Sequence, residues 1–220
     1  MVLASDGEGS AAGRLCTLYW LPIYGYLRRD GKSPHDAEDI TQDFFYHMLR
    51  RKDFGKVRPT GRFRSFLLTA LQNHLANLHE HESALKRGGG QKPLAIDTDV
   101  AEEHLRLEET AGLDPEKTYD RKWAQALIEH VLRQLALEQE SDGVAELFEH
   151  LRPLMVADPD AVPAAEIGRK IGKSAGAVRI AVFRLRKRFA KLLRQEVADT
   201  VESKELVEPE IDYLLSLFSG

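Results

Sequence analysis

The residues best suited to chemistry lie between Gly168 and Arg194, where the sequence holds ten lysines and arginines and no aspartate or glutamate. Exposed helices normally mix both signs, because opposite charges one turn apart stabilise a helix. Basic side chains neutralise phosphate, and arginine also forms paired hydrogen bonds with guanine. The run therefore favours nucleic-acid binding over the alternative, a solvated basic face on an ordinary helix.

Turn signals around this basic run predict a helix-turn-helix. A short helix is expected over 164–171, Gly172 breaks it, and Ser174 is placed to cap the next helix with its side-chain oxygen. Gly168 is expected where the two helices cross closely. Apolar residues at helical spacing predict the buried stripe of the second helix: Val178, Val182, Leu185, Phe189 and Leu192.

The opposite side of this second helix carries two arginines and two large apolar residues, Arg179, Ile180, Phe183 and Arg184. A helix that is held by a packed partner and presents arginines from its first turns has the form needed to enter a major groove. Ile180 offers only an apolar contact there, to a thymine methyl group. We therefore predict that this face contacts bases.

A second group of polar residues lies in SPHDAEDITQDFFYHMLRR, which begins at Ser33. Ser33 and Pro34 are typical of a helix start, and the acids that follow lie where the helix dipole favours negative charge. Helical spacing puts one group on an exposed side, Asp39, Gln42 and Asp43, and turns a second group inward, Ile40, Phe44 and Met48. The simple interpretation is a set of capping acids on a solvated face, because an exposed turn has no pocket that would raise a carboxyl pKa for acid-base catalysis.

A third segment pairs arginines with aromatic residues, at Arg62, Phe63, Arg64 and Phe66. Such pairs neutralise phosphate or stack on an unpaired base. Aromatic residues at this spacing also suit a helical core, so both interpretations stay open here.

Helical spacing of the apolar residues, without a convincing strand, predicts an all-α protein of two small helical domains joined by a flexible acidic linker. We expect a loose tail over 1–14 and a first helical domain over 15–90, which the run RGGGQKP ends. The acidic linker is expected over 91–120, followed by the helix-turn-helix domain over 121–196. An acidic extension with an amphipathic end is expected over 197–220.

Composition limits the classes of function. The chain has 220 residues and a formal net charge of -4, so DNA binding needs locally concentrated positive charge. The single cysteine, Cys16, favours a reducing compartment, and the sequence shows no secretory signal or bilayer-length apolar run. We therefore expect a cytoplasmic protein without membrane insertion. The histidines His74 and His81 lack zinc-site spacing, and phosphate-loop and nucleophile-elbow motifs are missing, so we predict no metal, cofactor or enzymatic activity.

Three motifs in order, DAEDITQDFF, FRSFLLTALQN and AEIGRKIGKSAGAVRIAVFRLRKRF, resemble a bacterial RNA polymerase sigma factor of the sigma-70 family, extracytoplasmic function (ECF) group. The resemblance implies a sigma region 2-like domain and a helix-turn-helix, sigma region 4-like domain. It also implies promoter-specific transcription initiation through the −10 and −35 elements. The implied partners are promoter DNA and core RNA polymerase, contacted at the clamp helices of its largest subunit and at its flap region.

The resemblance assigns roles to the matching positions. It implies polymerase binding for Asp36, Glu38, Asp39, Gln42, Asp43 and Phe44. It implies opening of the −10 element and capture of its bases for Arg62, Arg64, Asn73, Asn77, His81, Lys86 and Arg87. It implies recognition of the −35 element for Lys173, Ser174, Arg179, Ile180, Phe183, Arg184, Arg186 and Lys187.

The acidic extension raises a question of control, because sigma factors of this group commonly end soon after the recognition helix. It has an apolar face formed by Ile211, Leu214, Leu215 and Phe218. The extension either docks on the chain and masks a DNA or polymerase surface, or is a stabilising helix. Thr41 is a candidate for phosphorylation, which would add negative charge to the polymerase-binding surface. Whether an anti-sigma factor, a regulatory kinase or the extension controls the protein stays open.

Two functions from other classes also fit the sequence. One is a helix-turn-helix transcriptional regulator that binds operator DNA independently of polymerase, with an N-terminal domain that senses a ligand or dimerises. The other is an interaction adaptor. A sigma factor binds its promoter tightly only together with core polymerase, whereas a regulator binds duplex operator alone, usually as a dimer on a palindrome.

Overall fold

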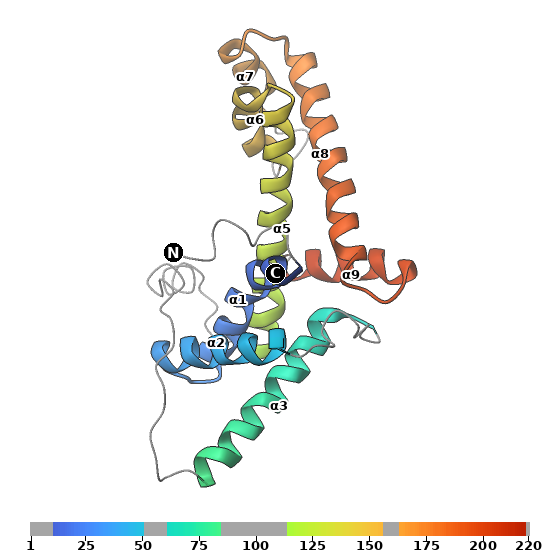
Figure 1. Cartoon of the computed structure of the whole chain (residues 1–220). Helices are drawn as coiled ribbons and strands as arrows, with labels where there is room; N and C mark the ends of the chain where they lie inside the picture. The colour runs from blue at the N-terminus through green and yellow to red at the C-terminus, as the bar shows by residue number, and fades with distance from the viewer. Residues whose placement is uncertain (1–10, 51–60, 85–113, 156–162, 219–220) are drawn as a thin grey trace. The chain divides into compact units, whose positions relative to one another are not determined.

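The computed structural model describes residues 11–50, 61–84, 114–155 and 163–218. Within these ranges every regular element is a helix, apart from one isolated β-bridge, so the predicted all-α class is confirmed for the described residues. The elements in chain order (Figure 1) are α1 (Ala11–Arg29), α2 (Pro34–Arg50), α3 (Phe63–Ala84), α5 (Pro115–Ser141), α6 (Ala145–Leu151), η1 (Arg152–Met155), α7 (Ala164–Lys170), α8 (Ala175–Ala198), η3 (Lys204–Leu206) and α9 (Val207–Ser216).

The chain divides into two compact units. Unit 1 comprises residues 1–126 and 200–220, and unit 2 comprises residues 127–199. The division differs from the predicted boundaries in two respects. Residues 121–126 belong to unit 1 and not to the helix-turn-helix domain, and so does the acidic extension from residue 200 onward. The C-terminal helix must therefore be considered together with the N-terminal helices.

The predicted tail and linker are each shorter than expected where the structure describes them. α1 begins at Ala11, inside the predicted tail, and α5 begins at Pro115, inside the predicted linker. The acidic composition that suggested a linker conceals Tyr119, which is fully buried next to the buried Trp123 on α5. The rest of the predicted linker, 91–113, and residues 1–10 lie outside the described residues.

The core of unit 1 draws its largest side chains from four helices. All of the following side chains are at most 2% exposed: Ile23, Tyr24 and Leu27 of α1, Phe44 of α2, Leu67 and Leu71 of α3, and Tyr119 and Trp123 of α5. Aromatic rings continue this core, because Tyr19 packs against Phe63 edge to face and stacks on Trp123. The packing positions the beginning of α3 against α1 and α5.

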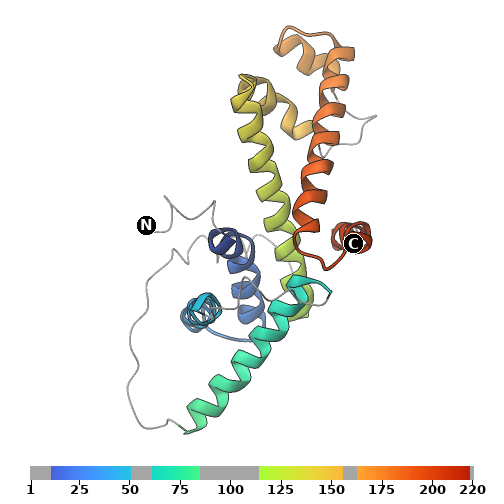
Figure 2. The ribbon, with the colours of Figure 1, turned by 45° about the vertical axis from the view of Figure 1, so that its right-hand side comes forward.

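Unit 2 is held together by the second half of α5, by α6 and η1, and by α7 and α8. Its buried apolar residues include Val131 and Leu135 of α5, Phe148 and Leu151 of α6, and Val178, Val182 and Leu185 of α8. The short α7 lies beside the beginning of α8 (Figure 2). No described helix combines the length and the apolar character that a bilayer span requires.

Candidate nucleic-acid interfaces

The helix-turn-helix forms as the turn signals predicted. Gly172 takes the left-handed conformation, with φ of 66°, and ends the first helix. The Ser174 side-chain oxygen accepts a hydrogen bond of 3.2 Å from the backbone N–H of Ala177, which caps α8. Gly168 lies against the backbone of the turn, so that a Cβ atom there would clash with the carbonyl oxygen of Lys173. The close approach of α7 to the turn therefore requires a glycine.

The two sides of α8 separate as the helical spacing predicted. Val178, Val182 and Leu185 are at most 7% exposed, whereas Ile180 and Phe183 are 55% and 67% exposed. Arg179 and Arg184 are also exposed on the outer side. Phe189 departs from the prediction, because it is only half-buried. Two large apolar side chains flanked by arginines are an unusual outer face for a solvated helix, and they match the surface predicted to contact bases.

The other −35 candidates divide by their contacts. Lys173, Ser174 and Lys187 are exposed. Arg186 is half-buried and donates hydrogen bonds to the carbonyl oxygens of Leu154, at 2.7 Å, and Met155, at 3.0 Å. Arg186 therefore ties η1 to α8, a structural contact that the sequence did not indicate.

One further arginine of the basic run, Arg188, joins α8 to α5 in unit 2. Arg188 forms a two-pronged ion pair with Glu138 of α5, one arm of which measures 2.7 Å from Arg188 Nε to Glu138 Oε2. The hydrogen bonds from Arg188 lower the pKa of Glu138. Part of the basic run is thus used to fix α8 against α5.

The acidic start of α2 is arranged largely as expected. The backbone N–H of Asp36 donates to the Ser33 hydroxyl at 3.1 Å, which confirms the predicted cap. Asp36 is exposed, and the other polar residues assigned to polymerase are half-exposed: Glu38, Asp39, Gln42 and Asp43. Phe44 is 2% exposed, so it faces the core as the helical spacing indicated, and it cannot itself form a surface contact.

The candidate phosphorylation site is corrected by the structure. Thr41 is fully buried, and its hydroxyl donates a hydrogen bond of 2.6 Å to the carbonyl oxygen of Ala37. A kinase cannot reach this hydroxyl in the folded chain. Thr41 faces inward because buried residues lie one helical turn before it and one helical turn after it on α2.

A short polar contact joins α2, which carries the polymerase-binding candidates, to α3, which carries the −10 candidates. His74 Nε2 of α3 lies 3.1 Å from Asp43 Oδ2 of α2, and the His47 ring lies beside that of His74. Burial lowers the pKa of His74, and the nearby charge of Asp43 opposes that shift only in part. The neutral ring is therefore favoured in the folded state.

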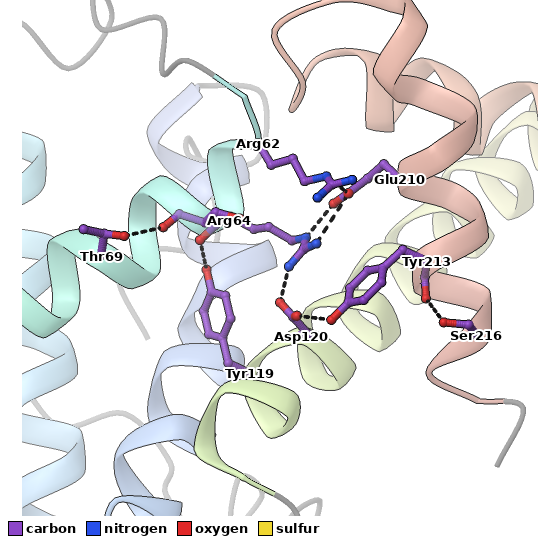
Figure 3. Close-up of polar contacts among 9 residues, drawn as sticks. Arg62, Arg64, Thr69, Tyr119, Asp120, Glu210, Tyr213 and Ser216 are labelled. Carbon is purple, nitrogen blue, oxygen red and sulfur yellow. Dashed lines mark hydrogen bonds and ion pairs between the residues drawn. The ribbon is translucent and has the colours of Figure 1, made fainter.

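A cluster of hydrogen bonds and ion pairs lies at the beginning of α3 (Figure 3). Arg64, 6% exposed, donates from Nε to Glu210 Oε1 of α9 at 2.5 Å, and its Nη1 pairs with Asp120 of α5. Arg62 pairs with the same Glu210, which is 1% exposed. The Tyr213 hydroxyl donates to the second oxygen of Asp120 at 2.5 Å. Two arginines predicted to contact DNA are thus held by three side chains that the sequence did not single out.

The protonation of this cluster follows from its contacts. Burial opposes the charged form of Arg64, but its hydrogen bonds to Glu210 and the charge of Asp120 outweigh burial and raise the pKa of the guanidinium. Burial, together with the hydrogen bond to Asp120, raises the pKa of Tyr213 to about 12. Arg64 therefore stays charged and the Tyr213 phenol stays protonated at neutral pH. The cluster brings together two arginine and two carboxyl side chains.

The remaining −10 candidates divide by whether the structure describes their side chains. Asn73 and Asn77 are exposed on α3. The side chain of His81, together with Lys86 and Arg87, lies outside the described residues. The aromatic partners Phe63 and Phe66 are half-buried, with ring centroids 6.0 Å apart, which fits a core-edge position.

The sequence contains a pattern that could have indicated the buried positions of Glu210 and Asp120. Glu210 lies three residues after Val207 and one before Ile211, within the apolar stripe that α9 buries, so helical spacing already turns it inward. A buried carboxylate requires a cationic partner. Asp120 likewise lies close in sequence to buried residues, Tyr119 and Trp123.

Neither a search for metal-binding groups nor comparison with known proteins assigns a role to a further residue. Among the described residues, no group of three histidine, cysteine, aspartate or glutamate side chains is arranged to hold a metal ion. No protein-family model, curated protein or solved structure in our comparisons matches this chain.

Proposed function

We propose that the chain is a sigma factor, which binds core RNA polymerase and directs transcription initiation from promoters with −10 and −35 elements. The observation that carries the proposal is the outer face of α8. There Arg179, Ile180, Phe183 and Arg184 are exposed on a helix whose other side is buried. The capped turn and the close contact at Gly168 support it by holding this helix rigidly on α7.

Arginine and apolar side chains together suit base recognition in the major groove. Arg179 and Arg184 are able to donate paired hydrogen bonds to guanine, and Ile180 and Phe183 offer contacts to thymine methyl groups. Exposed Lys173 and Lys187 are placed to contact phosphates. The half-exposed acidic side of α2 supports the polymerase-binding part of the proposal, because it offers negative charge to a basic partner surface.

The decisive experiment is transcription with purified core RNA polymerase, with and without this protein, from a library of promoter-bearing genomic fragments. We expect new transcripts with defined start sites only when the protein is added, and we expect the protein to co-purify with the core enzyme. If no fragment responds while the protein alone binds duplex DNA tightly as a dimer, the operator-binding regulator is the correct function instead.

Two substitutions on α8 are expected to have different effects. Arg184→Ala should change the preferred −35 sequence, with a discrimination loss of about 1–3 kcal/mol at one base pair. Lys187→Ala should weaken binding to all sequences alike and reduce the salt dependence by about one ion. Selection of bound sequences by the protein with core polymerase, repeated over a salt series, measures both effects. A uniform loss for Arg184→Ala and a changed preference for Lys187→Ala would show that another face contacts the bases.

A further inference from the structure

The C-terminal segment holds the beginning of α3 through its backbone. The N–H of Phe63 donates to the carbonyl oxygen of Thr200 at 2.8 Å, and the N–H of Glu202 donates to that of Gly61 at 2.9 Å. These bonds form an antiparallel bridge between Arg62 and Val201. The Glu202 carboxylate also accepts from the N–H of Gly61 at 2.6 Å. Backbone groups of Gly61 and Phe63, on either side of Arg62, are therefore already paired before any ligand arrives.

The same segment occupies the two arginine side chains. Glu210 accepts from Arg64 and pairs with Arg62, and burial of its side chain leaves it 1% exposed (Figure 3). A carboxylate and a nucleic-acid phosphate compete for the same donors of a guanidinium group. While Glu210 is in place, Arg64 is covered and Arg62 retains 37% of its side-chain surface. A nucleic-acid phosphate would therefore have to displace Glu210 to reach the covered donors of Arg64.

We propose that residues Thr200–Tyr213, here named the C-terminal latch, are a built-in inhibitor that must release Arg62 and Arg64 before they bind single-stranded DNA. This inference rests on the proposed function, because the resemblance assigns these arginines to the −10 element. The inference adds that the two arginines are regulated by a carboxylate of the same chain, that of Glu210.

The contacts of the cluster make release feasible. Arg64 keeps Asp120 as its ion-pair partner when Glu210 leaves, so no buried arginine is left without a carboxylate. The apolar side chains that α9 itself buries are only three, Val207, Ile211 and Leu214, and its release exposes them to water. A helix as short as α9 is not stable alone in water. The released latch is therefore expected to unfold, which hydrogen exchange detects.

The first test compares Glu210→Gln with the unaltered full chain. The probe is a short fluorescent single-stranded DNA of mixed sequence, and the readout is fluorescence anisotropy at several salt concentrations. We expect Glu210→Gln to bind about tenfold more tightly, because the substitution removes the competing charge. Glu205→Gln is the matched control, since it removes one acid from the same segment at an exposed position away from both arginines. Equal affinities for both variants would overturn the latch.

The second test does not depend on the folding of that variant. Arg62 and Val201 form a non-hydrogen-bonded antiparallel pair, whose Cα separation suits a disulfide. Arg62→Cys with Val201→Cys, in a Cys16→Ser background, closes the latch when oxidised and frees it when reduced. Because Arg62 is replaced in both forms, the comparison reports on Arg64 alone, and we expect the oxidised form to bind the probe several-fold more weakly than the reduced form. Equal binding by the two forms would contradict the proposal.

A third measurement separates the latch from the proposed function. Saturating single-stranded DNA should accelerate amide exchange in residues 207–216 of the unaltered chain, and unchanged exchange would contradict release. None of these readouts needs polymerase. If the latch tests succeed while promoter transcription fails, the sigma-factor function is wrong and the latch stands. If transcription succeeds and Glu210→Gln changes neither probe affinity nor transcript yield, the latch is wrong and the function stands.

Discussion

Replacing Glu210 by leucine is expected to lower the free energy of unfolding of unit 1 by about 3–5 kcal/mol, the usual cost of removing one partner from a buried ion pair. Glu210 is 1% exposed and Arg64 is 6% exposed, so little water is available to solvate the Arg64 donors that bonded Glu210, and Asp120 alone then balances the guanidinium. Both tryptophans of the chain, Trp20 and Trp123, belong to unit 1. Urea unfolding followed by their fluorescence therefore measures the effect.

A double substitution isolates the charge from the packing. Arg64→Met combined with Glu210→Leu removes both members of the pair, and it should be less destabilising than the sum of the single changes. The surface pair of Arg188 and Glu138 is the matched comparison, because its members are 38% and 34% exposed. Breaking that pair should cost about 0–1 kcal/mol. A Glu210→Leu cost as small as the surface value would show that the buried cluster does not hold α9 in place.

Replacing Gly168 by alanine is expected to destabilise unit 2 by about 1–3 kcal/mol, which is typical of overpacking a close contact. The new Cβ atom would meet the backbone carbonyl of Lys173, which cannot rotate away as a flexible side chain would. The turn must then move, and with it the N-terminal end of α8. Amide exchange of α8 in the folded chain measures the loss. Under the proposed function, binding of duplex −35 DNA together with core polymerase should fall with it.

Gly176→Ala is the matched control for this prediction. A Cβ atom at Gly176 would meet only the Ser174 hydroxyl, at 4.0 Å. Because alanine favours a helix over glycine by about 1 kcal/mol, this change should stabilise α8 slightly. A stabilising effect of Gly168→Ala, like that of Gly176→Ala, would mean that α7 and the turn separate without cost.

Local patterns predicted much of the helix-turn-helix from the sequence. Ser174 and Gly172 act through their nearest neighbours along the chain, as a cap and as a left-handed turn. The apolar spacing of α8 depends only on the geometry of one helix, so it separated Val178 and Val182 from the exposed Phe183. Helical spacing of the apolar residues on α2 also correctly predicted that Phe44 faces the core.

Acidic composition was a poorer guide. It led to a linker prediction that included Asp120 and to a separate extension that included Glu210. Both residues lie instead in the buried cluster of unit 1, at 9% and 1% exposure. Charge counts register the excess of acids in a segment, but they do not register that one acid of the segment lies on the buried side of a helix.

By itself the sequence determined the helical class, the cap and turn of the helix-turn-helix, and the two sides of α8. Each of these depends on residues within a few positions of one another. Only the tertiary structure decided the partners of Arg62 and Arg64, because Arg64 and Glu210 are 146 positions apart and meet only when α9 packs in unit 1. The physical reason is that a buried charge requires an opposite charge beside it, and the folded chain chooses which one.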